Sequence, residues 1–327
     1  MSLHPLSPGP RMESSTNVPL VSFVIETVNE ATEPDIDLGR VLGGISRQTW
    51  PSGRIEIVIV VDERNAAMID RIHHDFPHVR TLVVHDSNYF SMKREGTYAT
   101  TGDIIALLDS DCDPCPQWVE RAVARIQGGA DAVAGKTRYP RGARFGSTFS
   151  FFNFGYIQRL PDGQSTGFLP NNAAFRATVL RKHNFDPRIR RGGAGHLLGN
   201  QLKRLGYRLE YEPGMLATHN MYGVGEEMQM RVKAGFDAIN LARIDIDSAI
   251  DETRVLKQQN VLGLVRVFVR RLLFDLRTVF TNRADLDIAW WRIPWFLVVS
   301  PFIRCVELVS AVITIFWPNY FKNKYGW

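Results

Sequence analysis

The first half of the chain alternates apolar runs with segments of helical periodicity, and this alternation limits its fold more than any other feature. The apolar runs are residues 18–30, 54–63, 79–88 and 103–109. Runs of this kind are typical of strands buried on both faces of a parallel sheet. Between the first two runs, Leu38, Val41 and Ile45 recur at helical spacing. This order predicts βαβ units with right-handed crossovers, and therefore an α/β fold with a mostly parallel sheet.

Each predicted strand ends in polar, mostly acidic residues. They are Glu26, Thr27 and Asn29, then Asp62 and Glu63, then Asp86, Ser87 and Asn88, and finally Asp109 and Asp111. Because ligands bind outside the carboxyl ends of parallel strands, we expect these side chains to gather at one edge of the sheet. The alternative is that polar residues simply end strands, and the acidic bias at all four ends argues against it.

The segment DSDCDPCP, residues 109–116, allows two kinds of site. Its three aspartates offer the oxygen ligands that Mg²⁺ and Mn²⁺ prefer, whereas its two cysteines form the C-x-x-C of a redox or zinc site. Carboxylates beside the thiols would raise their pKa, and Cys305 lies too far downstream to complete a second ligand pair. The segment therefore favours a carboxylate site for a divalent cation, with thiols that carry no chemistry.

Five segments, in order from residue 21 to residue 220, resemble a family 2 glycosyltransferase of the GT-A fold. The segments are VSFVIETVNE (21–30), IVIVVDERN (57–65), SNYFSMKREGTYATTGDIIALLDSDCDP (87–114), GFLPNNAAFRATVL (167–180) and GYRLEYEPGMLATHN (206–220). They match the family's first two strands, its D-x-D segment, its acceptor-side segment, and its terminal strand with a metal-facing His. The resemblance implies a Rossmann-like nucleotide-sugar-binding domain that transfers a sugar to an acceptor hydroxyl.

The resemblance also implies a divalent cation, Mg²⁺ or Mn²⁺, to stabilise charge on the leaving diphosphate. Asp111 would bind the metal directly, and His219 would be a further protein contact to it. Asp109 would touch the ribose of the donor, or the metal through a water molecule.

Further donor-binding residues follow from the same resemblance. Thr27, Asn29 and Glu30 would line the nucleoside pocket. Asp62 would accept a hydrogen bond from the base, which favours uracil and a UDP-linked donor. The alternative for Asp62 is that it caps the helix that follows it.

Two more groups of polar residues match the family near the donor. Lys93 and Arg94 would reach the base or a phosphate, or else form a solvated basic face. The second group is Asn171, Asn172 and Arg176. These residues would lie near the donor sugar or the acceptor, or would simply form a turn and the start of a helix.

The chain departs from the family at the carboxylate pair that supplies the catalytic base. Ala194 and Gly195 occupy the place of that pair, and no carboxylate lies between Asp186 and Glu210. Losing a positioned base forgoes on the order of 10² to 10⁴ in rate. The adjacent His196 is the candidate base, because an imidazole titrates near neutral pH.

Three alternatives to His196 remain open. Glu226 or Glu227, after the last strand, could act as the base, or the base is another residue. Otherwise the protein binds a nucleotide sugar without transferring it. The glycines of residues 192–195 predict a mobile loop that closes over substrate. The absence of the Q-x-x-R-W signature of processive synthases favours the addition of one sugar per encounter.

The α/β pattern stops after residue 235, and two apolar segments follow. Residues 261–280 mix large apolar residues with four arginines, as in a basic amphipathic helix on an anionic membrane face. The alternative is a helix packed on the catalytic domain.

Residues 293–317 are nearly apolar and long enough to span a bilayer. Pro301 and the charged Arg304 and Glu307 lie inside this segment, and the basic tail should stay with the nucleotide-sugar domain on the cytoplasmic side. We therefore expect a re-entrant or interfacial hairpin broken at Ser300 and Pro301. Buried soluble helices are the alternative, and Arg304 and Glu307 are spaced to pair with each other.

The predicted organisation is a flexible tail (1–18), a GT-A domain (19–235) and a helical, membrane-associated region (236–327). We expect a nucleotide-sugar donor, a glycan or lipid-linked acceptor, and a location at the cytoplasmic face of the membrane. The net charge of +5 does not predict nucleic-acid binding, since no element interleaves basic and aromatic residues.

Two other functions are weighed against transfer. One is a catalytically silent nucleotide-sugar-binding protein of the same fold, which the missing carboxylate pair supports. The other is a sugar nucleotidyltransferase, which would need a glycine-rich, basic loop after the first strand. The sequence ETVNEATEPD at residues 26–35 is neither.

Overall fold

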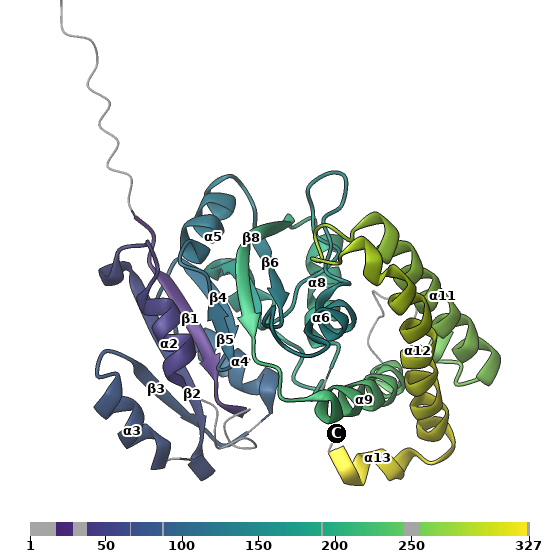
Figure 1. Cartoon of the computed structure of the whole chain (residues 1–327). Coiled ribbons are helices and arrows are strands. Elements are labelled where there is room, and N and C mark those ends of the chain that lie inside the picture. Colours follow the sequence, from purple (N-terminus) through teal and green to yellow (C-terminus); the bar gives the residue numbers. More distant parts are fainter. Residues whose placement is uncertain are drawn as a thin grey trace, which may run out of the picture.

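The computed structural model describes residues 18–28, 38–65, 67–86, 88–190, 192–244 and 255–325. An eight-stranded sheet in the order β3-β2-β1-β4-β7-β6-β8-β5 forms the centre of the molecule (Figure 1). The strands are β1 (Val21–Glu26), β2 (Ile55–Asp62), β3 (Arg80–Val84), β4 (Ile104–Asp109), β5 (Cys112–Pro114), β6 (Ala132–Arg138), β7 (Asn172–Arg176) and β8 (Leu209–His219).

The sheet has a parallel half and a mixed half. Strands β3, β2, β1 and β4 are parallel neighbours, which confirms the βαβ pattern and the predicted α/β fold. Strand β7 runs antiparallel to both β4 and β6, whereas β6 and β8 are parallel and β5 is antiparallel to β8. The carboxyl ends of β1, β2 and β4 therefore lie along one edge, which is where the acidic residues were expected to meet.

Helices cover both faces of this sheet. In the part of the chain that contains the sheet they are α2 (Leu38–Ser46), α3 (Ala67–Asp75), α4 (Tyr89–Ala99), α5 (Trp118–Gln127), α6 (Gly146–Phe154), α7 (Ala177–Lys182) and α8 (Ala194–Arg204). The helices described in the C-terminal part, where residues 245–254 lie outside the description, are α9 (Val224–Arg243), α11 (Val261–Thr281), α12 (Ile293–Phe316) and α13 (Pro318–Tyr325). Figure 1 shows these four gathered on one side of the molecule.

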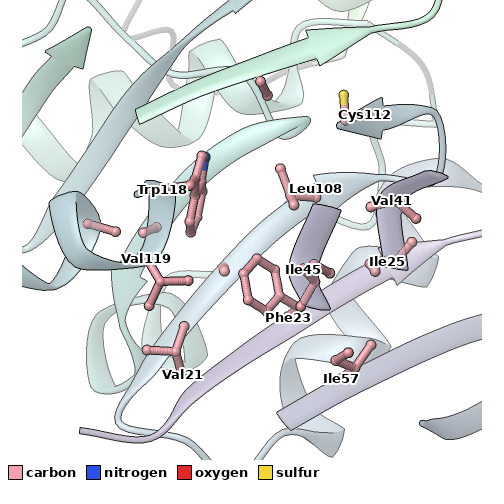
Figure 2. Close-up of a cluster of buried hydrophobic side chains, with 14 of the residues drawn as sticks. Val21, Phe23, Ile25, Val41, Ile45, Ile57, Leu108, Cys112, Trp118 and Val119 are labelled. Carbon is pink, nitrogen blue, oxygen red and sulfur yellow. The ribbon is translucent and has the colours of Figure 1, made fainter. Parts of the chain in front are cut away.

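Alternate residues of β1 pack on opposite faces of the sheet, which explains why the run is continuously apolar. Phe23 and Ile25 point toward α2 and α5, where the Phe23 and Trp118 rings lie 5.5 Å apart (Figure 2). Val24 belongs to the opposite cluster, under α4. There a Cβ on Gly96 would lie 2.5 Å from Val24, so α4 approaches the sheet closely only because residue 96 is glycine.

The predicted boundary at residue 235 falls inside the continuous helix α9. Gly235 is also the point of closest approach to α12, because a Cβ there would lie 2.1 Å from the carbonyl oxygen of Glu307. The C-terminal helices are therefore joined to the sheet domain through one uninterrupted element.

The predicted hairpin in the last apolar segment is wrong. Helix α12 runs unbroken through Ser300 and Pro301. A proline inside a helix removes one backbone hydrogen bond, but here packing holds the helix on both sides of it. Phe296 and Ile303, which flank Pro301, are buried against α6 and α11.

Buried ion pairs join α9, α11 and α12. Arg304 and Glu307 form the predicted pair at 2.6 Å, and Arg304 also binds Asp275 of α11 at 2.7 Å. Arg231 of α9 lies 3.4 Å from Glu307. Arg271, one of the four arginines of the predicted amphipathic helix, faces this network at 3.8 Å from Glu307. Charges buried in this way need partners, and here three helices supply them to one another.

Candidate functional site

The carboxyl ends of the central strands meet as the sequence predicted. Glu26, the last residue of β1, lies opposite Asp109, the last residue of β4. Asp62 ends β2, the neighbour of β1 on its other side. The Thr27 hydroxyl donates to the carbonyl of Val60 at 3.1 Å, which ties the end of β1 to β2. Asn29 and Glu30, the other predicted nucleoside contacts, lie outside the described residues.

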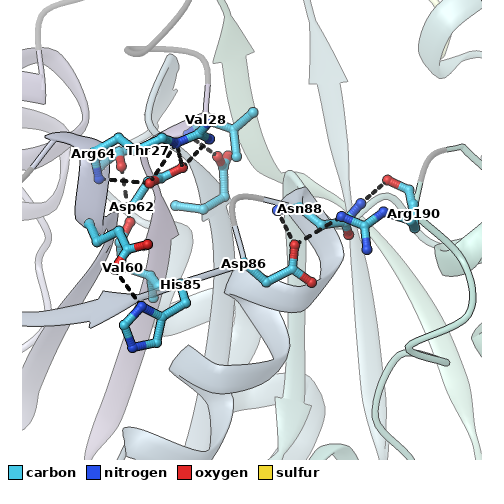
Figure 3. A network of polar contacts seen from close by, with 11 residues as sticks. Thr27, Val28, Val60, Asp62, Arg64, His85, Asp86, Asn88 and Arg190 are labelled. Carbon is cyan, nitrogen blue, oxygen red and sulfur yellow. Dashed lines mark hydrogen bonds and ion pairs between the residues drawn. The ribbon is translucent and has the colours of Figure 1, made fainter. Parts of the chain in front are cut away.

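Two of the acidic strand ends are already bound by arginines, as Figure 3 shows. Asp62 accepts from the backbone N–H of Arg64 at 2.9 Å and from its guanidinium at 3.0 Å, so it does cap the turn that follows. Asp86, after β3, is held by Arg190 at 3.0 Å. The carboxyl end of β3 is therefore tied to the loop before α8.

Asp109 is oriented by two buried donors from α4. The Tyr89 hydroxyl donates to its Oδ1 at 2.7 Å, and Lys93 Nζ lies 2.8 Å from the same oxygen. Lys93 is fully buried and also donates to the carbonyl of Leu108, so it faces the site rather than solvent. Arg94 faces elsewhere, since it pairs with Glu95 at 3.1 Å.

Glu26 is a buried carboxyl group at this edge with a strongly raised pKa. Burial and the neighbouring Asp109 raise its pKa to about 8, against a partial opposing effect of Lys93. Its Oε2 accepts from the Val28 N–H at 2.7 Å, whereas its Oε1 has no hydrogen-bond partner among the described residues. The single positive charge of Lys93 therefore cannot neutralise both Glu26 and Asp109.

Asp111 and His219 lie at the centre of the site. The Tyr222 hydroxyl donates to Asp111 Oδ2 at 2.6 Å, and Asp111 Oδ1 lies 3.5 Å from His219 Nε2. His219 Nδ1 is 2.7 Å from the carbonyl of Asn220, so Nδ1 carries a proton and Nε2 is the ring nitrogen that faces Asp111. A carbonyl that fixes the tautomer in this way is the usual second contact of a metal-binding histidine.

A divalent cation fits between these two side chains. Asp111 Oδ1 is buried and accepts no hydrogen bond from the described residues. Burial raises the pKa of Asp111, and Asp109 raises it further against the effect of His219. Burial alone would lower the pKa of His219, but Asp111 and Asp109 raise it above its ordinary value. A bound cation would restore the ionised carboxylate and the neutral imidazole, which are the ligand forms.

The two cysteines of residues 109–116 differ in burial, since Cys112 is buried and Cys115 is partly exposed. Cys112 lies opposite His219 in the β5–β8 ladder, and its sulfur is within 4.8 Å of the Asp111 and His219 ligand atoms. Burial, together with Asp111 and Asp109, raises its pKa well above the ordinary value, so the thiol stays protonated. Cys115 donates to the carbonyl of Gly214 at 3.3 Å.

Asn172 begins β7 beside the end of β4, where it is paired with Leu108, and Asn171 lies immediately before the strand. Asn171 accepts from the Thr137 hydroxyl at 3.3 Å. The Asn172 amide donates to carbonyls of β6 and β8, and its oxygen accepts from Trp118 Nε1 at 2.7 Å. Asn172 is thus a fully bonded connection between strands next to the site.

The structure does not bring Arg176 to this cluster. Arg176 is paired with Ile104 at the opposite end of β4 from Asp109. Its Nε donates to the carbonyl of Ala130 at 3.0 Å, and Asp131 lies 3.6 Å away. Strand β7 runs antiparallel to β4, so a residue near the end of β7 lies at the far edge of the sheet.

His196 is half-buried in the first turn of α8. The glycines before it do not form a separate loop in the described part of the chain, because Gly193 caps α8 with a φ of 100° and Ala194 begins the helix. A Cβ on Gly195 would lie 3.0 Å from the ring of Pro170. A larger residue at 195 therefore needs Pro170 to shift. His196, the next residue, supplies the polar side chain beside this position.

The two glutamates after β8 differ in burial. Glu226 is exposed, whereas Glu227 is buried and accepts from Asn153 Nδ2 at 2.6 Å. Asn153 also donates to the hydroxyl of Tyr139, whose ring packs edge-on against His219. Glu227 is thus connected to His219 through Asn153 and Tyr139, by a path of three contacts.

The sequence did not single out Tyr89 and Tyr222, which donate to Asp109 and Asp111. Tyr222 follows His219 by three residues, on the turn into α9, and that proximity was the available signal. The sequence contained no comparable signal for Tyr89, because only the packing of α4 on the sheet brings this residue to the site.

The family described as glycosyl transferase family 2 matches residues 22–183 of the chain. Glycosyltransferase AglE of Haloferax volcanii is 24% identical over 239 residues, which cover 71% of this chain and 77% of that protein. Glucosyl-dolichyl phosphate glucuronosyltransferase of the same organism is 36% identical over 84 residues, 24% of this chain and 26% of that one.

Among solved structures, the mannosyltransferase PcManGT from Pyrobaculum calidifontis, in complex with GDP-Man and Mn²⁺, has a similar fold. The TM-score is 0.61 at 18% sequence identity, with 93% of this chain and 88% of that chain covered. The similarity thus extends over the sheet domain and most of the C-terminal helices.

Proposed function

The chain belongs to glycosyl transferase family 2, and from this premise we propose that it transfers a sugar from a nucleotide-sugar donor to an acceptor hydroxyl with the help of a divalent metal. The observation that carries the proposal is the pair formed by Asp111 Oδ1, a buried acceptor without a hydrogen bond in the described residues, and His219 Nε2. The catalytic domain would be residues 19–235, with residues 236–327 as a helical attachment.

Asp111 and His219 would hold Mg²⁺ or Mn²⁺, which supplies positive charge to the departing diphosphate. Asp109, fixed by Tyr89 and Lys93, would accept from a ribose hydroxyl. A short, charge-assisted contact of this kind orients the donor before the bond breaks.

Thr27, Asn29, Glu30 and Asp62 would line the nucleoside pocket. Asp62 is available for this role only if the Arg64 side chain moves. That side chain is 70% exposed, and exposed ion pairs contribute little to stability, so a base can replace it. A uracil base, and hence a UDP-linked donor, fits an acceptor carboxylate at this place.

We assign His196 as the base that takes the proton of the acceptor hydroxyl. Its ring is half-buried in the first turn of α8, beside the place of the family's carboxylate pair. Asn171, just before β7, would contact the donor sugar or the acceptor, whereas the amide of Asn172 is already bonded within the protein. The silent nucleotide-sugar-binding protein remains the second candidate, favoured by Ala194 and Gly195 in place of the carboxylate pair.

The test is to measure donor binding and donor turnover separately, with Mn²⁺, in wild type, His196→Ala and Glu227→Gln. We expect His196→Ala to retain nucleotide affinity and to lower turnover by about 10² or more. Loss of turnover in Glu227→Gln alone would move the base to Glu227. Tight binding with no hydrolysis or transfer by the wild type would favour the silent protein.

We also propose that the C-terminal helices rest on an anionic lipid surface at the cytoplasmic face of the membrane, which suits a lipid or lipid-linked glycan acceptor. The outer face of α11 is apolar with Arg266, Arg270 and Arg277 exposed among the apolar side chains. Its exposed apolar residues are Leu262, Val265, Val269, Leu273, Phe274 and Phe280. This combination is typical of helices that lie in the membrane interface.

Helix α12 continues this surface. Its exposed apolar residues are Trp295, Leu297, Val298, Phe302, Val309 and Phe316. Residues Trp290–Phe316 are long and apolar enough to cross a membrane by length and composition, a test that buried helices of soluble proteins also pass. The inner face of α12 is held from Trp295, which donates to Thr148, to Thr314, whose carbonyl accepts from Arg243. These contacts with α6 and α9 favour a helix lying in the plane of the membrane.

A further inference from the structure

Two basic side chains on β6 hold a single carboxylate from the turn between α11 and α12. Lys136 Nζ lies 3.1 Å from Asp287 Oδ2, and Arg138 lies 3.2 Å from the same oxygen. Residues 136 and 138 share a face of the strand because side chains alternate. A break in the β6–β8 register lies immediately before Lys136, and such irregularities often re-aim side chains beside functional sites.

The cation pair has binding capacity beyond Asp287. Arg138 Nε is buried and has no hydrogen-bond partner among the described residues. The two side chains line a pocket with Ser150, Phe154, Tyr211 and Leu286. Two cations that converge on one oxygen, with a further donor beside them, are the arrangement that binds a phosphate group.

Asp287 has a left-handed backbone conformation. Its φ of 55° lies in the left-handed region, which is unfavourable for residues other than glycine, asparagine and aspartate. Burial would raise its pKa, but Lys136 and Arg138 lower it below the ordinary value, so it stays ionised. Its side chain is 40% exposed, which leaves an exchanging anion a route of entry.

The position of Lys136 and Arg138 favours binding of the acceptor rather than binding of the donor. Arg138 is paired with Thr218, the residue before His219, and the next residue, Tyr139, packs against the His219 ring. The anion site thus adjoins the proposed metal site from the β6 side, away from β1. The turn that carries Asp287 connects the two helices with exposed apolar faces, so a lipid attached to the anion would meet an apolar surface.

We propose that Lys136 and Arg138 form a binding subsite for a phosphate group of a lipid-linked acceptor, and that Asp287 occupies this subsite until the acceptor displaces its carboxylate. The proposal rests on the proposed function, since it assigns the acceptor of that reaction. It makes Asp287 an internal competitor, so removing its charge should strengthen acceptor binding.

The test uses the full chain in detergent micelles, with farnesyl phosphate, farnesol and inorganic phosphate as probes. We expect Asp287→Asn, which tolerates the same backbone conformation, to bind farnesyl phosphate about tenfold more tightly than wild type. Lys136→Ala and Arg138→Ala should each weaken that binding by about tenfold. Farnesol should bind equally to all variants. The matched controls are Asp75→Asn, which removes a similarly exposed carboxylate, and Arg208→Ala, which removes a paired cation at the other end of β8.

A purely structural Asp287 would make the Asn variant bind more weakly or unchanged, and either result would overturn the proposal. Tighter binding of inorganic phosphate, but not of farnesyl phosphate, by Asp287→Asn would also overturn the proposal. The subsite would then not bind the phosphate group of a lipid-linked acceptor. If the two β6 variants weaken UDP binding with Mn²⁺ instead, the subsite belongs to the donor. Wild type that binds no nucleotide at all refutes the proposed function, whereas normal nucleotide binding with no effect of Asp287→Asn refutes this inference alone.

Discussion

At the scale of single residues, the site depends on Asp111, because most of the neighbouring carboxylates are already bound within the protein. Asp113 shows the contrast, because it pairs with Arg47 at 2.8 Å on the other side of the D-x-D segment. Asp111 keeps one buried oxygen without a hydrogen bond in the described residues. The same residue type therefore has two different roles two positions apart.

The first prediction compares these two aspartates. Asp111→Asn should lower Mn²⁺-dependent nucleotide affinity by at least about tenfold, as losing a metal contact does. Asp113→Asn should leave that affinity unchanged, because it removes only a partly exposed ion pair. The measurement is calorimetric titration of UDP with and without Mn²⁺. An equal effect of both changes, or none, would refute the metal assignment.

The second prediction concerns the pH dependence of stability and Glu26. In the metal-free protein its pKa is about 8, against an ordinary value of 4.5, so between these values the folded state holds a proton that the unfolded chain has released. Stability therefore falls as pH rises through this window. Glu26→Gln should be more stable than wild type at pH 8, by on the order of a few kcal/mol, and nearly equal at pH 5.

Thermal unfolding of the metal-free protein at both pH values checks this. Glu56→Gln is the matched control with the opposite sign. Burial would raise the pKa of Glu56, but bonds from Ser22, Thr101 and Arg80 lower it. Its stabilising contribution is present above its ordinary pKa and lost below it, so the Gln variant should be less stable than wild type at pH 8. Destabilisation by Glu26→Gln at pH 8 would contradict the account.

At the scale of elements, close contact between helices determines how the C-terminal part is attached. Helix α9 can approach α12 only because residue 235 lacks a side chain, and Ser310 of α12 then donates to the Val232 carbonyl at 2.6 Å. The ion pairs of Arg231, Arg304, Asp275 and Glu307 lie in the same interface. The interface explains why α12 remains a single helix despite Pro301.

The third prediction tests this contact with two glycines of one helix. Gly235→Ala should destabilise the protein by about 1 to 3 kcal/mol, because its Cβ would meet the backbone of Glu307. Gly225→Ala, also in α9 but with nothing within 4 Å of its Cβ, should be neutral or stabilising by up to about 1 kcal/mol. Chemical denaturation of the full chain measures both. Equal effects would show that α9 and α12 do not pack as described.

At the scale of the whole molecule, the apolar and basic surface of α11 and α12 lies to one side of the sheet (Figure 1). The candidate site lies at the carboxyl edge of the central strands, and the α11–α12 turn reaches β6 next to it. A lipid surface under these helices would bring a lipid-linked acceptor to the metal-bound donor without any large movement of the domain.

The fourth prediction is vesicle binding. Wild type should float with vesicles that contain phosphatidylglycerol, and high salt should weaken the binding because the arginines act through screened charge. Val269→Glu on α11 should lower partitioning by about tenfold. Val83→Glu, an equally exposed valine on β3, should have no effect. Equal partitioning of both variants, or no wild-type binding, would refute the attachment.

The sequence by itself determined the strands, their order in βαβ units and the acidic composition of one edge, because hydrophobic periodicity and strand polarity are local properties of the chain. It also supplied Asp111 and His219, through the spacing of segments that match the family. Tyr89 could not be predicted, because only the packing of α4 on the sheet brings its hydroxyl to Asp109. Tyr222, three residues after His219, and the local contact of Arg64 with Asp62 were within reach of sequence reasoning but were not singled out.

The tertiary structure alone decided three further points. Arg176 lies at the far edge because β7 enters the sheet antiparallel, a choice of direction that no local pattern encodes. Helix α12 is unbroken at Pro301 because α6, α9 and α11 hold it, so packing outweighs the cost of one missing hydrogen bond. Asp287 meets Lys136 and Arg138 across about 150 residues of chain, and only the closing of the fold creates such a contact.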